Sequence, residues 1–138
     1  MIFKGKDEPL GIPIHHHQVS DGELKTWAET MVFSATVIVA IAADEALRRK
    51  FYGNPYDDPD FERRAVRSIM YMIRCAVAHN PVRPVWQCKS HYLQTFEIPA
   101  LRIKLDCASV DGKQVHASDY GGWDKFKRLA DRCLERVS

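Results

Sequence analysis

The feature that most constrains the fold is a long segment, residues 21–49, that contains no proline and shows helical periodicity. Ser20 or Asp21 can cap its start, with Glu23 near its positive end. Apolar residues lie on nearly all sides of this helix, and one stripe consists of Leu24, Trp27, Met31, Ile38 and Ile41. Such a helix is usually buried against more than one neighbour. We therefore expect it to contact other helices of a bundle or a second subunit.

Two further helices and a hairpin follow from local signals. Asp60 is an N-cap candidate, and Asn80-Pro81 ends the helix that follows it at about His79. Alternating residues after Tyr92 indicate a half-buried strand, and Asp111-Gly112 is typical of a tight turn. A last helix is expected over residues 122–136, with its apolar side formed by Trp123, Phe126, Ala130, Cys133 and Leu134.

These elements predict a mainly α-helical protein, a small helical bundle with an inserted short β-hairpin at about residues 92–115. The 138 residues fit one domain, residues 21–138, after an arm of residues 1–20 that contains His15, His16 and His17. Adjacent histidines point away from one another, so we do not expect them to form a metal site.

Composition excludes several classes of protein. With 46% hydrophobic and 28% charged residues, the chain is neither disordered nor fibrous. The four cysteines form no Cys-x-x-Cys pair, so we predict no zinc knuckle, no redox pair and no cofactor. The apolar run from Met31 to Ala43 is shorter than the ~20 residues that cross a bilayer. We expect a cytoplasmic protein that does not contact membranes.

The strongest candidates for catalytic side chains lie in the stretch from Arg74 to His79. Arginine keeps its charge and binds phosphate oxygens, whereas histidine titrates near neutrality, so the two can act on a phosphodiester without a metal. Five residues on a helix correspond to ~140° of angular separation. One chain would therefore not present Arg74 and His79 as a tight pair. Two copies related by a two-fold axis could present both pairs to one shared cleft.

The segment from Ile73 to Asn80 resembles the signature of the HEPN family, in which an arginine is followed four to six residues later by a histidine on a helix. The resemblance includes the small and aliphatic residues between the two positions, Asn80 after the histidine, and the proline-rich segment with Trp86 that comes next. It implies a helical bundle that forms a homodimer, with the paired motifs lining a cleft.

The resemblance also implies a function. Active members of the family cleave RNA without a metal, many as toxins or defence proteins, some with an antitoxin partner. His79 would then transfer protons as the ribose 2′-hydroxyl attacks the phosphate, and Arg74 would bind that phosphate. Arg63 and Arg67, on the same helix, are expected to extend the positive strip for RNA, and Asn80 to orient the histidine or the RNA.

One departure leaves a second interpretation open. Cys75 follows the arginine, where many active members have asparagine. The alternative to a ribonuclease is a non-catalytic HEPN-like protein that binds RNA or a nucleotide, or serves as a dimeric interaction module.

Overall fold

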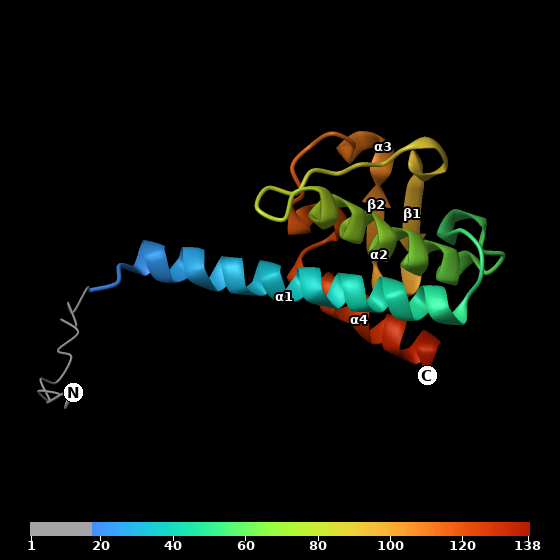
Figure 1. Ribbon diagram of the computed structural model, residues 1–138, viewed down its shortest axis with the longest axis horizontal. Helices are drawn as coiled ribbons and strands as arrows, with labels where there is room; N and C mark the ends of the chain where they lie inside the picture. The colour runs from blue at the N-terminus through green and yellow to red at the C-terminus, as the bar shows by residue number, and fades with distance from the viewer. Residues whose placement is uncertain (1–17) are drawn as a thin grey trace, which may run out of the picture.

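The structure is a computed structural model that describes residues 18–138, so the predicted arm lies outside the described residues except for its last three positions. The chain is mainly helical with one small antiparallel hairpin, as predicted (Figure 1). Its main elements are α1 (Asp21–Lys50), α2 (Phe61–His79), β1 (Thr95–Ile98), β2 (Ile103–Asp106), α3 (Cys107–Val110) and α4 (Trp123–Val137). Helix α1 packs against α2 and α4, and the hairpin packs against α2.

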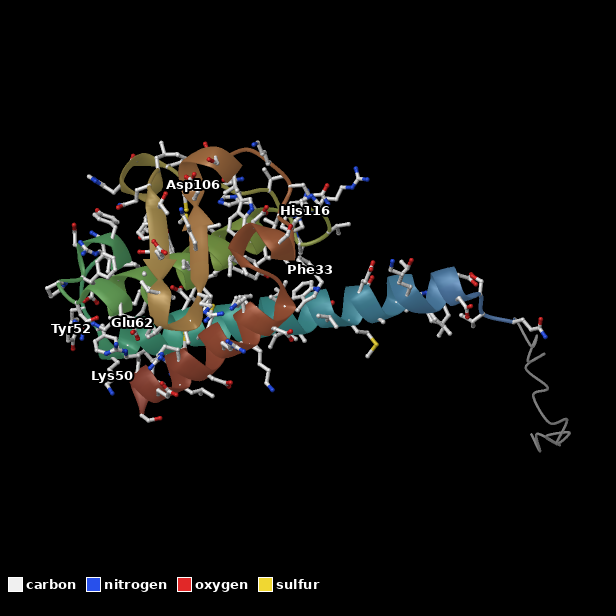
Figure 2. The ribbon with its side chains drawn as sticks, turned by 180° about the vertical axis from the view of Figure 1, so that it is seen from behind. Phe33, Lys50, Tyr52, Glu62, Asp106 and His116 are labelled. Atoms are coloured by element: carbon white, nitrogen blue, oxygen red, sulfur yellow. The ribbon has the colours of Figure 1, made fainter. Side chains whose placement is uncertain are left out.

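Helix α1 begins at a capping box. The Ser20 hydroxyl accepts a hydrogen bond from the Glu23 backbone N–H at 3.2 Å, and the Glu23 carboxylate accepts one from the Ser20 N–H at 2.9 Å. The helix leaves the body of the protein at about Phe33, and its first half projects freely (Figures 1 and 2).

Only one side of α1 is buried in the chain, namely Thr36, Ala40, Asp44 and Leu47. The expectation that α1 is buried on more than one side is therefore wrong for the isolated chain. Met31 is 73% exposed and Ile38 is 68% exposed. The stripe that periodicity assigned to a core lies on the surface.

Helix α2 has the predicted bounds and the predicted core face. The Asp60 carboxylate caps it by accepting a hydrogen bond from the Arg63 N–H at 2.7 Å. Four apolar residues of the predicted stripe are buried: Val66, Met70, Ile73 and Val77. Asn80 takes an extended conformation ahead of Pro81, which ends the helix.

The hairpin lies inside the predicted range but turns elsewhere. Phe96 pairs with Leu105 and Ile98 pairs with Ile103. The turn between the strands is a 3-10 helix, Pro99–Leu101, that closes on Arg102 in the left-handed region at φ 53°. Gly112, expected to form this turn, instead follows α3, and its N–H donates to the Trp86 carbonyl at 2.9 Å.

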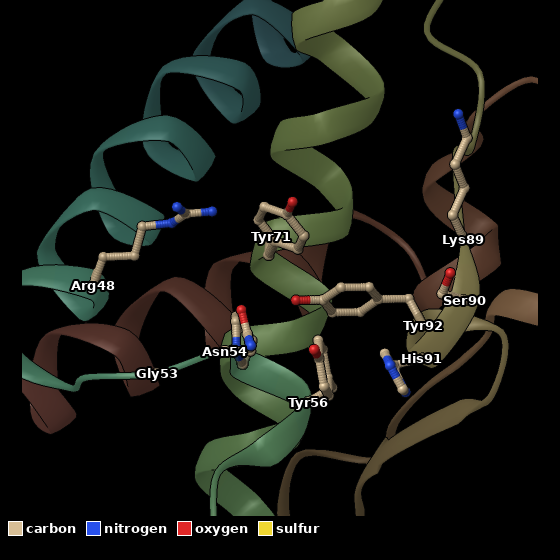
Figure 3. Close-up of a pocket in the computed structure, with 10 residues that line it drawn as sticks. Arg48, Gly53, Asn54, Tyr56, Tyr71, Lys89, Ser90, His91 and Tyr92 are labelled. Carbon is tan, nitrogen blue, oxygen red and sulfur yellow. The ribbon is translucent and has the colours of Figure 1, made fainter.

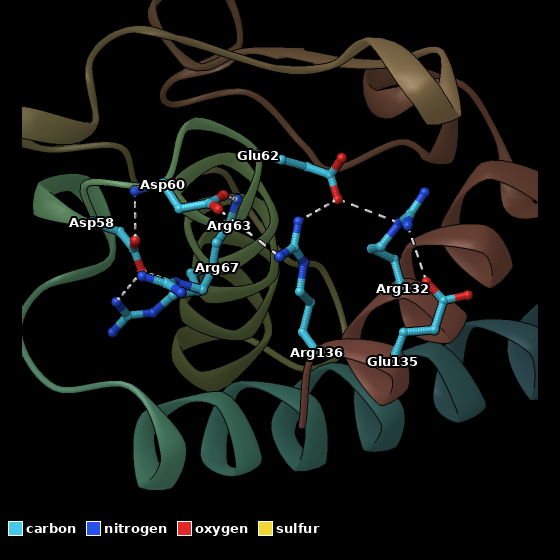
Figure 4. A network of polar contacts seen from close by, with 8 residues as sticks. All are labelled: Asp58, Asp60, Glu62, Arg63, Arg67, Arg132, Glu135 and Arg136. Carbon is cyan, nitrogen blue, oxygen red and sulfur yellow. Dashed lines mark hydrogen bonds and ion pairs between the residues drawn. The ribbon is translucent and has the colours of Figure 1, made fainter. Parts of the chain in front are cut away.

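Helix α4 closes the core with Phe126, Leu129 and Cys133. Trp123 and Leu134, which were expected to face inward, are exposed. Arg132 and Arg136 of α4 bind the Glu62 carboxylate of α2, which joins the two helices at their outer surface (Figure 4).

Candidate functional site

Arg74 lies on the flank of α2 that faces α1. Its Nε is 3.4 Å from Oδ2 of Asp44, and 40% of its side chain is exposed. The same carboxylate oxygen is 2.9 Å from Nε of Arg48, one turn further along α1. One aspartate therefore holds two arginines, and the guanidinium of Arg74 is fixed in place while still open to solvent.

Asp44 is itself buried, with 3% of its side chain exposed. Burial raises the pKa of its carboxyl, although Arg48 and Arg74 act in the opposite direction. Burying a carboxylate in this environment costs free energy unless it forms ion pairs with nearby cations. The two arginines therefore stabilise the buried carboxylate of Asp44. Together they carry two positive charges against its single negative charge, so this part of the surface keeps a net positive charge.

His79 is the last residue of α2 and is exposed. It continues a stripe of Tyr71 and Cys75 at four-residue spacing, and all three line a hollow of about 240 Å³ between α2 and the segment of residues 87–92. Arg74 lies beside this stripe and faces α1. The two motif residues thus border different flanks of one helix, as the angular separation predicted.

Asn80 has a backbone role. Its side-chain oxygen accepts hydrogen bonds from the N–H groups of Val82, at 3.2 Å, and Arg83, at 3.0 Å. These bonds shape the turn after α2 and so fix the direction in which the chain leaves His79.

The other two arginines predicted to bind RNA have structural partners instead (Figure 4). Arg67 is 2% exposed, donates to Asp58 at 2.8 Å, and donates to the carbonyls of Phe51 and Gly53. Arg63 donates from Nε to the same Asp58 oxygen at 2.7 Å. Neither guanidinium is free for a phosphate strip, so the structure gives no support to that role.

The pKa of Asp58 reflects these bonds. Burial would raise the pKa of this carboxyl, but the hydrogen bonds from Arg63 and Arg67 outweigh it and lower the pKa to about 2. The cluster joins the loop after α1 to the first turns of α2, and it stabilises the fold.

Sequence reasoning missed a second feature, an aromatic hollow of about 360 Å³ beside the stripe (Figure 3). It shares Tyr71, Lys89 and Tyr92 with the hollow at His79, so the two lie next to each other. We call the combined surface the tyrosine groove. Its main lining residues are Arg48, Tyr56, Tyr71, Lys89, His91 and Tyr92, with His79 at one end.

The rings of the groove contact one another. Tyr71 and Tyr92 have centroids 5.0 Å apart, and Tyr56 stacks on His91 at 4.5 Å. The Arg48 guanidinium carbon lies 4.9 Å from the centroid of Tyr71. Only the stripe of Tyr71 and His79 at helical spacing could have indicated this groove, because the remaining residues come from separate loops.

Cys75, the departure from the family pattern, is half-buried beside Tyr71. A hydrogen bond to Cys75, followed by burial, raises the pKa of Tyr71, and burial raises the pKa of Cys75. Both groups therefore stay protonated at neutral pH, whereas reactive cysteines are typically thiolates. Within residues 18–138, no group of three or more potential ligand side chains is arranged to hold a metal ion.

An apolar surface runs along α1 and α4 on the side away from α2. Two hollows of about 410 and 290 Å³ lie between these helices, and Val39 and Ala130 line both. Among the described helices, α1 alone is long and apolar enough to cross a membrane by length and composition, a test that core helices also pass.

No family model, curated protein or solved structure matches this chain.

Proposed function

We propose that the protein is a metal-independent endoribonuclease of the HEPN type that acts as a homodimer. The observation that carries this proposal is the pairing of a fixed, solvent-accessible Arg74 with an exposed His79 at the end of the same helix. The first supplies a permanent positive charge for phosphate, and the second supplies an imidazole that can accept or donate a proton.

The proposed reaction needs no further groups. His79 accepts the proton of a ribose 2′-hydroxyl as that oxygen forms a bond to the adjacent phosphorus. Arg74 stabilises the charge on the phosphoryl oxygens, the bond from phosphorus to the 5′-oxygen breaks, and that oxygen takes up a proton from solvent water. The products are a 2′,3′-cyclic phosphate and a 5′-hydroxyl.

The positions of the two residues favour a site shared by two subunits. Arg74 faces α1, whereas His79 borders the tyrosine groove on the other flank of α2. A substrate phosphate could meet Arg74 of one subunit and His79 of the other if the two helices faced each other across a two-fold axis.

The exposed stripe of α1 supports dimerisation. A helix of 30 residues is about 45 Å long, and Leu24, Trp27, Met31 and Ile38 stand on its solvent side. A contiguous apolar surface of this kind is typical of an interaction site. Ile41 lies one turn before Asp44 and is also exposed, so the stripe continues into the part of α1 that contacts Arg74.

The biological setting that we propose is a cytoplasmic toxin or defence protein, which would have an antitoxin protein as a further partner. Growth assays test this. Expression of the wild type should arrest growth, and expression of His79→Ala should not. Equal growth would contradict the toxin role while leaving the chemistry open to the direct assay below.

The direct assay incubates purified protein with single-stranded RNA in EDTA. We expect cleavage by the wild type, a loss of about 10²–10⁴-fold in His79→Ala, and a loss of about 10²–10³-fold in Arg74→Ala. His116→Asn is the control, because His116 is also exposed and asparagine retains its N-cap position. Cleavage that persists in His79→Ala would overturn the proposal.

The alternative function, binding of RNA or a nucleotide without cleavage, is favoured by the tyrosine groove, which can hold a ligand whether or not Arg74 and His79 catalyse a reaction. Intact RNA together with retained binding in the EDTA assay would establish that alternative.

A further inference from the structure

The tyrosine groove has the composition of a site for an anionic, planar ligand. Lys89 and His91 stand exposed at its rim, and Arg48 lies over Tyr71. Within the described chain, none of the residues that line it is an aspartate or a glutamate. Its larger hollow, about 360 Å³, falls within the range of small-ligand sites.

The groove is also held in shape. Tyr92 is half-buried and packs against Tyr71 and Phe96, and burial raises the pKa of Tyr92, so its hydroxyl stays neutral. Arg48 is fixed by the buried Asp44. Tyr56 and His91 stack with their planes inclined by 19°, and the outer face of His91 is open to solvent.

The segment that carries Lys89 and His91 includes a strained residue. Ser90 has φ 53°, in the left-handed region that a residue with a Cβ atom rarely occupies. Such conformations cost free energy and persist where the surrounding structure imposes them, often at binding sites. Here the strained turn lies between Lys89 and His91, and both residues line the pocket on the side across from Arg48, with His91 against Tyr56 (Figure 3).

Aromatic faces interleaved with cations bind single-stranded nucleic acid, because any base can stack on a ring while the cations meet phosphates. We propose that the tyrosine groove binds the single-stranded RNA segment next to the scissile phosphate. A base stacks on the outer face of His91, and Lys89 and Arg48 bind flanking phosphates. The strand then runs toward His79 at the other end of the groove. This inference rests on the proposed ribonuclease function, because that function places the scissile phosphate at the His79 end of the groove.

Binding can be measured apart from cleavage. A fluorescent single-stranded DNA oligonucleotide has no 2′-hydroxyl and cannot undergo the proposed reaction. We expect the wild type to bind it in an anisotropy titration. Lys89→Glu and His91→Ala should each weaken binding by about tenfold or more. Arg128→Glu is the matched charge reversal, at an exposed position of α4 outside the groove, and should affect binding much less than Lys89→Glu does.

The outcomes separate this inference from the nuclease. Binding that depends on Lys89 and His91, without any RNA cleavage, would support the groove and overturn the nuclease. Cleavage that depends on His79, with unchanged binding in Lys89→Glu and His91→Ala, would overturn the groove and leave the nuclease standing. Failure of the wild type to bind the oligonucleotide, or equal weakening by Arg128→Glu, would also overturn the groove.

Discussion

Asp44 is the residue on which the candidate site depends most, although it touches no substrate in the proposed reaction. It is buried, and its oxygen contacts the Nε atoms of Arg48 and Arg74. Arg48 belongs to the tyrosine groove and Arg74 to the proposed cleavage site. One buried carboxylate therefore positions a cation at each of the two sites.

Replacing Asp44 with asparagine should lower cleavage by about tenfold or more, because Arg74 would lose its fixed position. It should also lower the free energy of unfolding by about 1–3 kcal/mol, since the buried charge that forms ion pairs with Arg48 and Arg74 is removed. Urea denaturation and initial cleavage rates measure the two effects. Glu45→Gln is the control, because it removes a surface pair with Arg49 that contributes at most about 1 kcal/mol. Unchanged cleavage in Asp44→Asn would contradict the positioning role.

The cluster around Asp58 predicts a loss of stability in acid. Its carboxyl has a pKa of about 2 when folded and an ordinary value of 3.8 when unfolded, so the unfolded state binds a proton more readily. The stabilisation is therefore present above pH 4 and is lost as the pH falls from about 4 to 2. This difference corresponds to about 2 kcal/mol.

Two measurements check this prediction. Carbon NMR titration should show Asp58 changing charge near pH 2. Urea unfolding of the wild type between pH 5 and 2 should lose more stability than Asp58→Asn, which cannot titrate. Asp57→Asn is the exposed neighbour and should follow the wild type. A titration midpoint for Asp58 near pH 4 would show that the arginines do not lower the pKa of its carboxyl.

At the scale of the elements, the helices follow from local sequence and the groove does not. Ser20 and Asp60 cap α1 and α2, and Pro81 stops α2, so their bounds could be predicted from neighbouring residues alone. The tyrosine groove is lined by residues of α1, α2 and two loops, and no local sequence pattern indicates that these segments lie together.

Arg67 shows a different limit of sequence reasoning. An arginine on the flank of a helix occupies the same position in the sequence pattern whether its side chain faces solvent or pairs with a buried carboxylate. Its partner, Asp58, precedes the helix by three residues and points back toward it, which only the folded loop determines. The hairpin turn shows the same limit, because Pro99 and Arg102 provide a turn that competes with the stronger signal at Gly112.

The exposed stripe of α1 predicts how assembly can be broken. Ile38→Glu places a charge on this stripe and should convert the proposed dimer to a monomer without changing helical content. Light scattering after gel filtration and circular dichroism measure the two properties. Phe61→Glu is the control, because Phe61 is also an exposed apolar residue but lies at the far end of α2. A dimer that survives Ile38→Glu would exclude the centre of this stripe as the interface, and a wild-type monomer would exclude the shared cleft altogether.

At the scale of the whole molecule, the proposed reaction depends on two subunits. One chain contains a cation, a titratable group and an aromatic groove, but Arg74 and His79 lie on different flanks of α2. Dimerisation is the step that would place the groups around one phosphate and cover the exposed apolar surface of α1. Loss of the dimer in Ile38→Glu should therefore abolish cleavage while the tyrosine groove still binds an oligonucleotide.

Complementation between two inactive variants tests the shared site most directly. Arg74→Ala and His79→Ala are mixed, allowed to exchange subunits, and assayed for RNA cleavage in EDTA. Half of the dimers should then be mixed, and each would contain one site with an intact Arg74 from one subunit and an intact His79 from the other. If the site is shared, activity should recover to about a quarter of the wild-type value. A mixture that remains as inactive as either variant alone would contradict a shared site.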